Sequence, residues 1–234
     1  MITIGESHTV RSFDEELDHL RKTVGKMGEQ AERQLRESLQ AMAAHDAEGA
    51  AKVIAADRDT DTFESEINAI SVRCLALRQP MADDLRTLVT AFKISAEFER
   101  VADLAANIAK RGMWMHQALP LPALRNAVRL GEIVADRIAQ VTAAYATCDA
   151  DAAAEIWRTD TDIDELYSAL FRSILTYMME DPRLISASTH LLFVAKNLER
   201  CGDHATNIAE MIHYLCRGIP LYEARPKADT SIAT

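Results

Sequence analysis

The chain is poor in glycine, proline and aromatic residues: its 234 residues include eight Gly and six Pro, and 6% are aromatic. Glycine and proline disrupt helices, and aromatic residues are enriched in strands. The shortage of all three, together with abundant Ala, Glu and Arg, therefore indicates a helical protein. No apolar run approaches the roughly 20 residues that a membrane-spanning helix needs. Apolar residues still make up 48% of the chain, enough for a core in one large domain or two small ones.

Cysteine is scarce as well, and its spacing matches no disulfide framework. In a chain of this size, such spacing predicts reduced thiols in a cytosolic protein. The first ten residues contain neither a basic nor an apolar segment, so we expect no signal peptide. The four cysteines are Cys74, Cys148, Cys201 and Cys216.

Positive charge is in deficit, and the net charge is −10. This balance opposes general binding to nucleic-acid phosphates and to an anionic lipid surface, and it suits cations or a basic protein partner. Motifs typical of common enzymes are missing too: we find no G-x-x-x-x-G-K-[ST], G-x-S-x-G, H-E-x-x-H or paired C-x-x-C. We also find no nucleophile with an evident base.

Apolar residues recur every three or four positions through most of the first half, as in long packed helices. Ser12 and Glu15 form a capping box that predicts where the first helix begins. Asp46 is the expected N-cap of the second helix, and Asp83 or Asp84 that of the third. The three helices are expected over residues 12–45, 47–79 and about 83–115.

The second half repeats this organisation after a proline cluster around Pro120. Asp149 takes the place of Asp46, Asp181 and Pro182 suit the start of the last helix, and Gly218 suits its end. We therefore predict an all-α protein of two tandem, pseudo-symmetric three-helix bundles. The expected units are a first bundle over 1–117, a second over 118–218 and a tail over 219–234.

One motif occurs in both halves, as Glu99-Arg100-x-x-Asp103 and again as Glu199-Arg200-x-x-Asp203. An Asn follows four residues later each time, and steps of four keep these side chains on one stripe of a helix. With an offset of 103, a second acidic pair also repeats, on the middle helix of each half. The candidate ligands are Glu99, Asp103, Asn107, Glu199, Asp203 and Asn207, with Asp57, Asp61, Asp160 and Asp164 as additional or supporting ones.

Clustered carboxylates and amide oxygens are hard ligands that suit Mg, Mn, Ca or iron. The simpler interpretation is a solvated helix face on which Arg100 and Arg200 pair with neighbouring acids. Duplication favours a metal or partner role, because drift would not keep Glu, Asp and Asn while changing the residues between them. Cys201 lies inside the second motif, but on the far side of the helix from the acids, which favours a buried thiol.

An enzymatic alternative is a carboxylate di-iron site, which needs Glu and Glu-x-x-His groups inside a helical bundle. Glu16-x-x-His19 and Glu210-x-x-His213 have this spacing. On a helical wheel of the last helix, however, the acids span about 0° to 80° and the apolar residues centre near about −100°. The acids are therefore expected at the surface or edge of the bundle.

At these residues the sequence resembles the PhoU family, from about Phe13 to Gly218. Ala102 and Cys201 depart from the family pattern, which has Gly and an aliphatic residue there. The marks that carry the resemblance are Arg78-Gln79-Pro80 with Asp84-Leu85-Arg86, the two Glu-Arg-x-x-Asp motifs, and Tyr177-Met178-Met179-Glu180-Asp181.

The resemblance implies two three-helix bundles, comparable to spectrin repeats, in a cytoplasmic protein that acts at the inner face of the membrane through protein partners. It implies a non-enzymatic regulator that represses the phosphate-starvation response and phosphate uptake. The implied partners are a sensor histidine kinase and the ATPase subunit of the phosphate ABC transporter, and a homodimer is expected. The implied cofactors are divalent or ferric ions (Fe, Mn, Mg or Zn) at Glu99 with Asp103 and Glu199 with Asp203.

Overall fold

The computed structural model describes residues 4–115, 120–159 and 161–221, with the backbone alone for 4–12 and 121. The described residues form seven α-helices and one 3-10 turn, and they contain no strand. The elements are α1 (Ile4–Ala44), α2 (Ala47–Arg78), α3 (Asp83–Trp114), α4 (Leu121–Thr147), α5 (Ala150–Arg158), α6 (Thr161–Glu180), η1 (Pro182–Leu184) and α7 (Ile185–Arg217).

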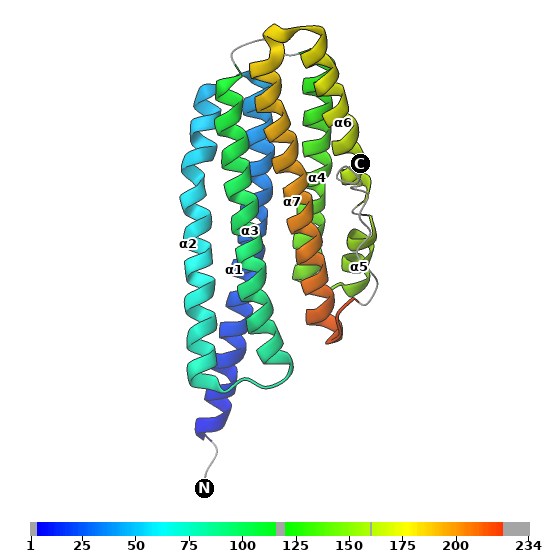
Figure 1. The fold of residues 1–234 in the computed structure, drawn as a ribbon. Helices are drawn as coiled ribbons and strands as arrows, with labels where there is room; N and C mark the ends of the chain where they lie inside the picture. Colours follow the sequence, from blue (N-terminus) through cyan, green and yellow to red (C-terminus); the bar gives the residue numbers. More distant parts are fainter. Residues whose placement is uncertain (1–3, 116–119, 160, 222–234) are drawn as a thin grey trace.

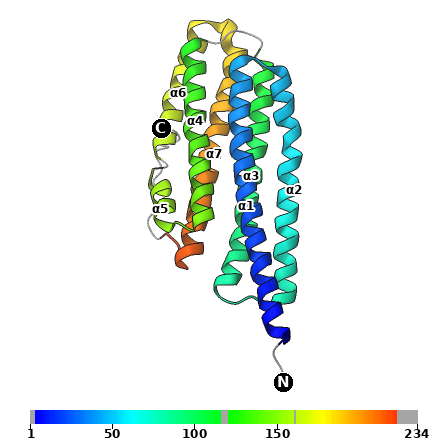
Figure 2. The same ribbon diagram turned by 180° about the vertical axis from the view of Figure 1, so that it is seen from behind.

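The helices form two bundles side by side (Figure 1). The first contains α1, α2 and α3; the second contains α4, α7 and the pair α5 and α6, which together take the place of one long helix. Helices α3 and α7 pack against each other on one side of the molecule, and α1 and α4 do so on the other (Figure 2). The predicted all-α fold of two three-helix bundles is confirmed.

One continuous apolar core runs through both bundles and includes residues from all seven helices, such as Leu35, Phe98, Ile138 and Leu198. Because α1, α3, α4 and α7 each contribute to it, the two halves share a single interior. None of the helices in the described part of the chain is long and apolar enough to cross a membrane. The predicted limits of the two units stay a prediction, since residues 116–119 lie outside the described part.

Helices α1 and α4 approach closely at two glycines. A Cβ on Gly28 would lie 2.5 Å from Thr142 Oγ1 and 2.8 Å from the Phe98 ring, and one on Gly131 would lie 2.5 Å from Leu39. Gly28 and Gly131 are 103 residues apart, as are Leu39 and Thr142, so the same contact is made twice in reciprocal form. The repeat seen in the sequence therefore also organises the contact between the halves.

Local signals for helix ends are mostly confirmed. Asp46 accepts a hydrogen bond from Gly49 N at 3.0 Å, and Asp149 accepts from Asp151 N and Ala152 N at 3.1 and 2.9 Å. Gly218 ends α7 with a φ of 72°, in the left-handed region that glycine adopts without strain.

Three expected helix boundaries are wrong. Helix α1 begins at Ile4 and not at Ser12, because no proline interrupts the preceding turns. Helix α3 has Ala82 as its N-cap, and the two aspartates lie in its first turn, where their charge favours the positive helix end. Asp181 does cap the turn after α6, as expected, but η1 stands between it and α7.

The repeat predicts one long middle helix in the second half, beginning after Asp149 as the second helix begins after Asp46, but this helix is broken between α5 and α6. Thr159 ends α5, and its hydroxyl donates to the carbonyl oxygens of Glu155 and Ile156 at 3.0 and 3.2 Å. Threonine bonded in this way competes with the backbone ladder. Arg137 of α4 also donates to the Thr159 hydroxyl at 2.5 Å, so a contact with another helix helps to place the break.

The prediction of four reduced cysteines is wrong. Cys148, the C-cap of α4, forms a disulfide with Cys216 in the last turn of α7, with a Cα–Cα distance of 5.8 Å. The other two cysteines, Cys74 and Cys201, are free and buried. The disulfide partners are 68 positions apart, and only the parallel course of α4 and α7 brings them together. Such bonds persist in oxidising surroundings and are normally reduced in a cytosol.

The glycine contacts predict opposite effects for two similar substitutions. Gly28→Ala should destabilise the protein by about 1–3 kcal/mol, because the new methyl group overpacks against Thr142 and Phe98. Gly25→Ala, in the same helix with nothing within 4 Å of its Cβ position, should stabilise it by about 0.5–1 kcal/mol through helix propensity. Urea denaturation of both variants measures this difference, and equal stabilities would contradict the close contact.

Candidate functional site

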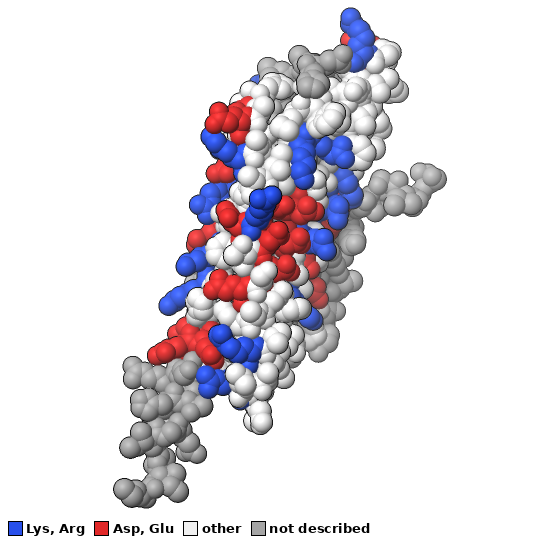
Figure 3. Space-filling model, turned by 90° about the vertical axis from the view of Figure 1, so that its left-hand side faces the viewer, with Lys and Arg blue, Asp and Glu red and all other residues white. Residues whose placement is uncertain are grey.

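The first candidate site is a group of five carboxylates on the neighbouring helices α2 and α3, which we call the first acidic cluster. Neighbouring carboxylates of this group raise the pKa of Asp57 and that of Glu99, and acidic side chains gather at mid-height of this face (Figure 3). Three come from α2 and two from α3, so the cluster needs both helices. Its members are Asp57, Asp61, Glu64, Glu99 and Asp103.

Ionising this cluster is unfavourable. Burial raises the pKa of Glu99; Arg100 opposes the shift, and Glu64, Asp103 and Asp61 add to it. Burial likewise raises the pKa of Asp57, with Asp103 and Asp61 adding to the effect. A cation between these oxygens would relieve the repulsion.

The second acidic cluster, on the neighbouring helices α6 and α7, contains Asp164, Glu199 and Asp203. Glu199 is almost fully buried, with 7% of its surface exposed, and Lys196 Nζ lies 2.7 Å from its Oε2. Burial raises the pKa of Glu199; Lys196 opposes this, while Asp203 and Asp164 add to it. Asp160, predicted as a supporting ligand, lies outside the described residues.

The two clusters therefore differ in charge. Lys196 holds an ammonium group in the second cluster, whereas the equivalent position of the first half is Ala96. In the first cluster, Arg100 Nε is 3.5 Å from Glu99, and Lys110 acts on Asp57 only through a longer-range interaction. The first cluster thus offers more carboxylate oxygens and has no lysine at the position of Lys196.

The predicted Asn ligands lie differently from the acids. Asn207 donates from Nδ2 to Glu97 Oε2 of α3 at 3.2 Å, and His204 Nδ1 lies 2.7 Å from the same oxygen. We call these three residues the polar joint, since they connect the two bundles. Asn107 is half-buried at the equivalent place on α3. The polar joint was not predicted. The sequence did contain a signal for it, because the first repeat has Leu104 where the second has His204.

In the polar joint, burial alone would raise the pKa of Glu97, but the hydrogen bonds from His204 and Asn207 outweigh it and lower the pKa. Glu97 is therefore a charged group that both bundles hold in place. Its partners leave Asn207 turned toward α3 rather than toward the second acidic cluster.

The groups expected for a di-iron site do not come together. Glu16 forms an ion pair with Arg78 at 3.2 Å, and His19 pairs with Glu66 at 2.9 Å. His213 Nδ1 lies 3.2 Å from the Ile219 carbonyl oxygen. These pairings belong to different helices and different surroundings, so the spacing that suggested an interior oxidase site does not produce one.

Among the side chains that the structure describes, in residues 13–115, 120, 122–159 and 161–221, no three of His, Cys, Asp or Glu converge in a way that could hold a metal ion. The donor chemistry of the two acidic clusters fits hard cations, since all the donors are oxygens. Metal binding there stays a prediction, and it requires the carboxylates to rotate toward one another.

Ala102, where the family pattern has Gly, fits its surroundings. A Cβ on the equivalent Gly202 would lie 3.1 Å from Ile163 of α6. The position equivalent to Ile163 in the first half is the smaller Thr60, which is also buried, and Ala102 itself is fully buried. The larger residue on α3 is thus matched by a smaller one on α2. Cys201 is fully buried, as predicted, and burial raises the pKa of its thiol.

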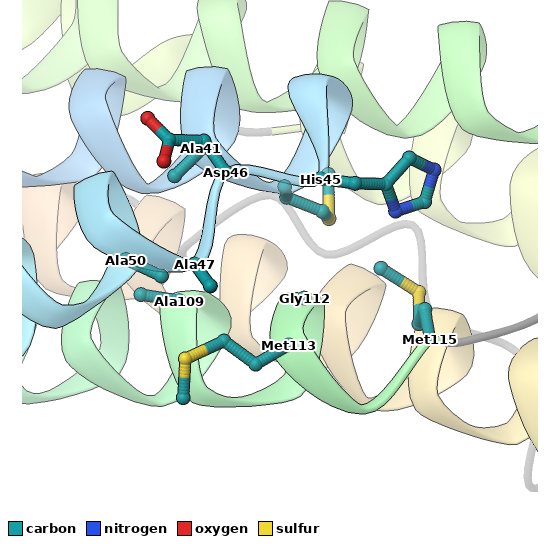
Figure 4. Close-up of a pocket in the computed structure, with 10 residues that line it drawn as sticks. Ala41, His45, Asp46, Ala47, Ala50, Ala109, Gly112, Met113 and Met115 are labelled. Carbon is teal, nitrogen blue, oxygen red and sulfur yellow. The ribbon is translucent and has the colours of Figure 1, made fainter.

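A separate pocket of about 470 Å³ lies at the turn between α1 and α2 (Figure 4). Small residues, including Ala50, Ala109 and Gly112, leave this space beside Met42 and Met115. Its acidic residue, Asp46, is engaged as the cap of α2. The sequence predicted no function here, and the lining presents no paired acid and base.

Comparison with known proteins agrees with the duplicated architecture. The family model described as the PhoU domain matches the chain twice, over residues 24–112 and 127–212. The chain belongs to the PhoU family. The two PhoU matches fall on the two bundles and end close to the C-termini of α3 and α7, so each repeat of the acidic motif lies within one match.

Relatives in the PhoU family are similar over nearly their whole length. A PhoU homologue of Caulobacter vibrioides, named a phosphate-specific transport system accessory protein, is 50% identical over 223 residues, 95% of this chain and 97% of its own. PhoU of Escherichia coli, with the same description, is 36% identical over 211 residues, 90% of this chain and 88% of its own.

Crystal structures of PhoU proteins share the fold. PhoU from Pseudomonas aeruginosa has a TM-score of 0.85 at 34% identity and covers 88% of this chain and 100% of its own. The phosphate transport system regulatory protein PhoU from Streptococcus pneumoniae has a TM-score of 0.80 at 28% identity, covering 90% and 100%.

The raised pKa of Glu99 predicts that its charge destabilises the folded protein when no cation is bound. A raised folded-state pKa means that ionisation costs stability above that pKa, and that the cost disappears below the ordinary value of 4.5. In EDTA at pH 7.5, Glu99→Gln should therefore raise the free energy of unfolding by a few tenths of a kcal/mol. The gain should vanish as the pH falls below 4.5.

Asp59→Asn is the matched control, because Asp59 lies on α2 and is exposed. Denaturation curves of both variants at several pH values measure the effect. A loss of stability in Glu99→Gln at pH 7.5, or an equal gain in both variants, would show that the cluster carries no repulsion.

Proposed function

We propose that this chain is a non-enzymatic accessory regulator of phosphate transport. The observation that carries the proposal is its similarity, over nearly its full length, to proteins named as accessory or regulatory proteins of phosphate transport systems. The absence of an evident nucleophile and base in the sequence agrees with a regulatory role. The acids also lie on neighbouring helices outside the shared apolar core, and this placement agrees with a regulatory role as well.

In this role the chain would act as a negative regulator of the phosphate-starvation response and of phosphate uptake. It would connect the ATPase subunit of the phosphate ABC transporter with the sensor histidine kinase, working in the cytoplasm at the inner face of the membrane. The long faces of α2 and α6, on opposite sides of the body, would suit two protein partners (Figure 1). The net charge of −10 disfavours direct contact with anionic lipid, so recruitment would come through proteins.

Deleting the gene tests the regulatory role. The phosphate-starvation genes should be expressed in phosphate-replete medium in the deletion strain, and a plasmid copy of the natural gene should restore repression. Transcript levels measure the result. A deletion strain that represses these genes normally at high phosphate would refute the proposal.

We also propose that both acidic clusters bind divalent or ferric cations, with the first cluster binding more tightly. The first cluster has five carboxylates and no lysine at the position of Lys196; burial raises the pKa of Glu99 and that of Asp57 there, and neighbouring carboxylates add to both shifts. In the second, a metal ion must displace the Lys196 ammonium from Glu199. Open oxygen-only sites of this kind should bind exchangeably and with modest affinity.

This difference predicts opposite outcomes for two substitutions. Glu99→Gln combined with Asp103→Asn should remove most manganese binding at the first cluster without lowering the thermal stability of the EDTA-treated protein. Lys196→Met should increase binding at the second cluster by about tenfold, since it removes the competing charge, an effect of about 1.4 kcal/mol. Titration calorimetry with Mn²⁺ and elemental analysis measure both.

Lys52→Met is the control for lost positive charge, because Lys52 pairs with Glu48 at 2.8 Å on an exposed helix face. It should leave binding unchanged. Unaltered manganese binding in the double variant would refute the first site, and unaltered binding in Lys196→Met would refute the competition.

A further inference from the structure

A second kind of site lies at the end of the molecule where α4 and α7 terminate. A pocket of about 330 Å³ opens there between residues of α1, α3, α4 and α7. Its wall includes Arg21 of α1, Arg86 of α3 and Tyr145 of α4, together with the Cys148–Cys216 disulfide. None of these residues belongs to the acidic clusters, and neither the sequence analysis nor the family resemblance gave them a role.

The pocket is positively charged in an otherwise acidic protein. Its ionised side chains are two arginines, Arg21 and Arg86, against one aspartate, Asp83, which gives a formal charge of +1 where the whole chain has −10. Asp83 pairs with Arg86 from the rim, where its side chain is 86% exposed. Arg21 has only a long contact with Asp18, at 3.8 Å.

Two donors in this pocket have no hydrogen-bond partner among the described residues. Arg86 Nε is buried and unpaired, and so is the hydroxyl of Tyr145, a residue with only 5% of its surface exposed. Burial raises the pKa of Tyr145, and the charge of Arg21 opposes this shift by a smaller amount. The hydroxyl therefore keeps its proton and can donate a hydrogen bond. Leaving such a group unpaired costs about 1–3 kcal/mol, which an acceptor in the pocket would offset.

Arg86 occupies space that a side chain at position 218 would otherwise take. A Cβ on Gly218 would lie 3.1 Å from Arg86 Nη1, so the glycine that ends α7 also leaves room for the guanidinium group. The carbonyl ends of α4 and α7 lie nearby and oppose an anion. Two helix ends, each with about half a negative charge, offset about the whole net charge of +1, so the case for an anion rests on the unpaired donors, whose acceptor the helix ends do not supply.

We propose that this pocket binds a small tetrahedral oxyanion, with inorganic phosphate as the chemical class that it fits. Guanidinium groups bind phosphate through paired hydrogen bonds, and the neutral Tyr145 hydroxyl supplies a further donor at the buried end. A phosphate ion presents acceptor oxygens in several directions, so it can reach Arg21, Arg86 and Tyr145 together. The proposal is independent of the regulatory role and of metal binding.

Titration of the full chain with inorganic phosphate in the presence of EDTA tests the site, because EDTA removes cations that could hold phosphate at the acidic clusters. Saturable binding of about one phosphate per chain is expected, and sulfate should compete with it. Arg86→Gln and Tyr145→Phe should each weaken binding at least about tenfold. Tyr145→Phe removes a hydroxyl that has no partner, so its melting temperature should not fall.

Arg158→Gln is the matched control, since Arg158 is an exposed arginine near Glu155, at 3.6 Å, and lies away from the pocket. It should bind phosphate as the natural chain does. No saturable binding up to about 10 mM phosphate, or unchanged binding in both pocket variants, would overturn the proposal. Acetate that competes as well as sulfate would overturn the assignment to a tetrahedral oxyanion.

Discussion

The close contact of α1 with α4 is the constraint on which the rest of the structure depends. Two glycines, Gly28 and Gly131, let the helices approach until Thr142 and Leu39 fill the space that side chains would take. At this spacing one apolar core can run through both bundles. It also sets α3 beside α7, so that Glu97 reaches His204 and Asn207. The acidic clusters then lie on the outer helix pairs, α2 with α3 and α6 with α7.

The two repeats share an architecture and differ in their electrostatics. The first acidic cluster has five carboxylates in mutual repulsion, while Lys196 sits beside Glu199 in the second. Packing compensates for other differences, as where Ala102 with Thr60 in one half replaces Gly202 with Ile163 in the other. A duplicated fold can therefore keep its interior while its two acidic clusters differ in charge. We expect regulation by cations to act mainly through the first half.

The proposed anion pocket places positive charge at one end of a body whose mid-height carries negative charge (Figure 3). Cations and oxyanions would then bind at separate places and act on different helices. The pocket includes the C-terminal turn of α7, whose earlier turns carry the second acidic cluster, so one rigid helix connects both sites. Coupling between them would need a helix with two positions.

The sequence by itself determined what depends on neighbours within one or two helical turns. The helix caps at Asp46 and Asp149, the glycine end at Gly218 and the stripes through Glu99 and Glu199 follow from local spacing, because residues four positions apart lie on one face of a helix.

Only the tertiary structure decided the contacts between distant segments. The Cys148–Cys216 disulfide joins residues 68 positions apart, and His204 meets Glu97 across 107 positions. The break after Thr159 depends partly on Arg137 of another helix, and the unpaired donors of Arg86 and Tyr145 arise where four helices meet. These features depend on how closely helices pack and which ends coincide, and periodicity along one helix carries no information about either.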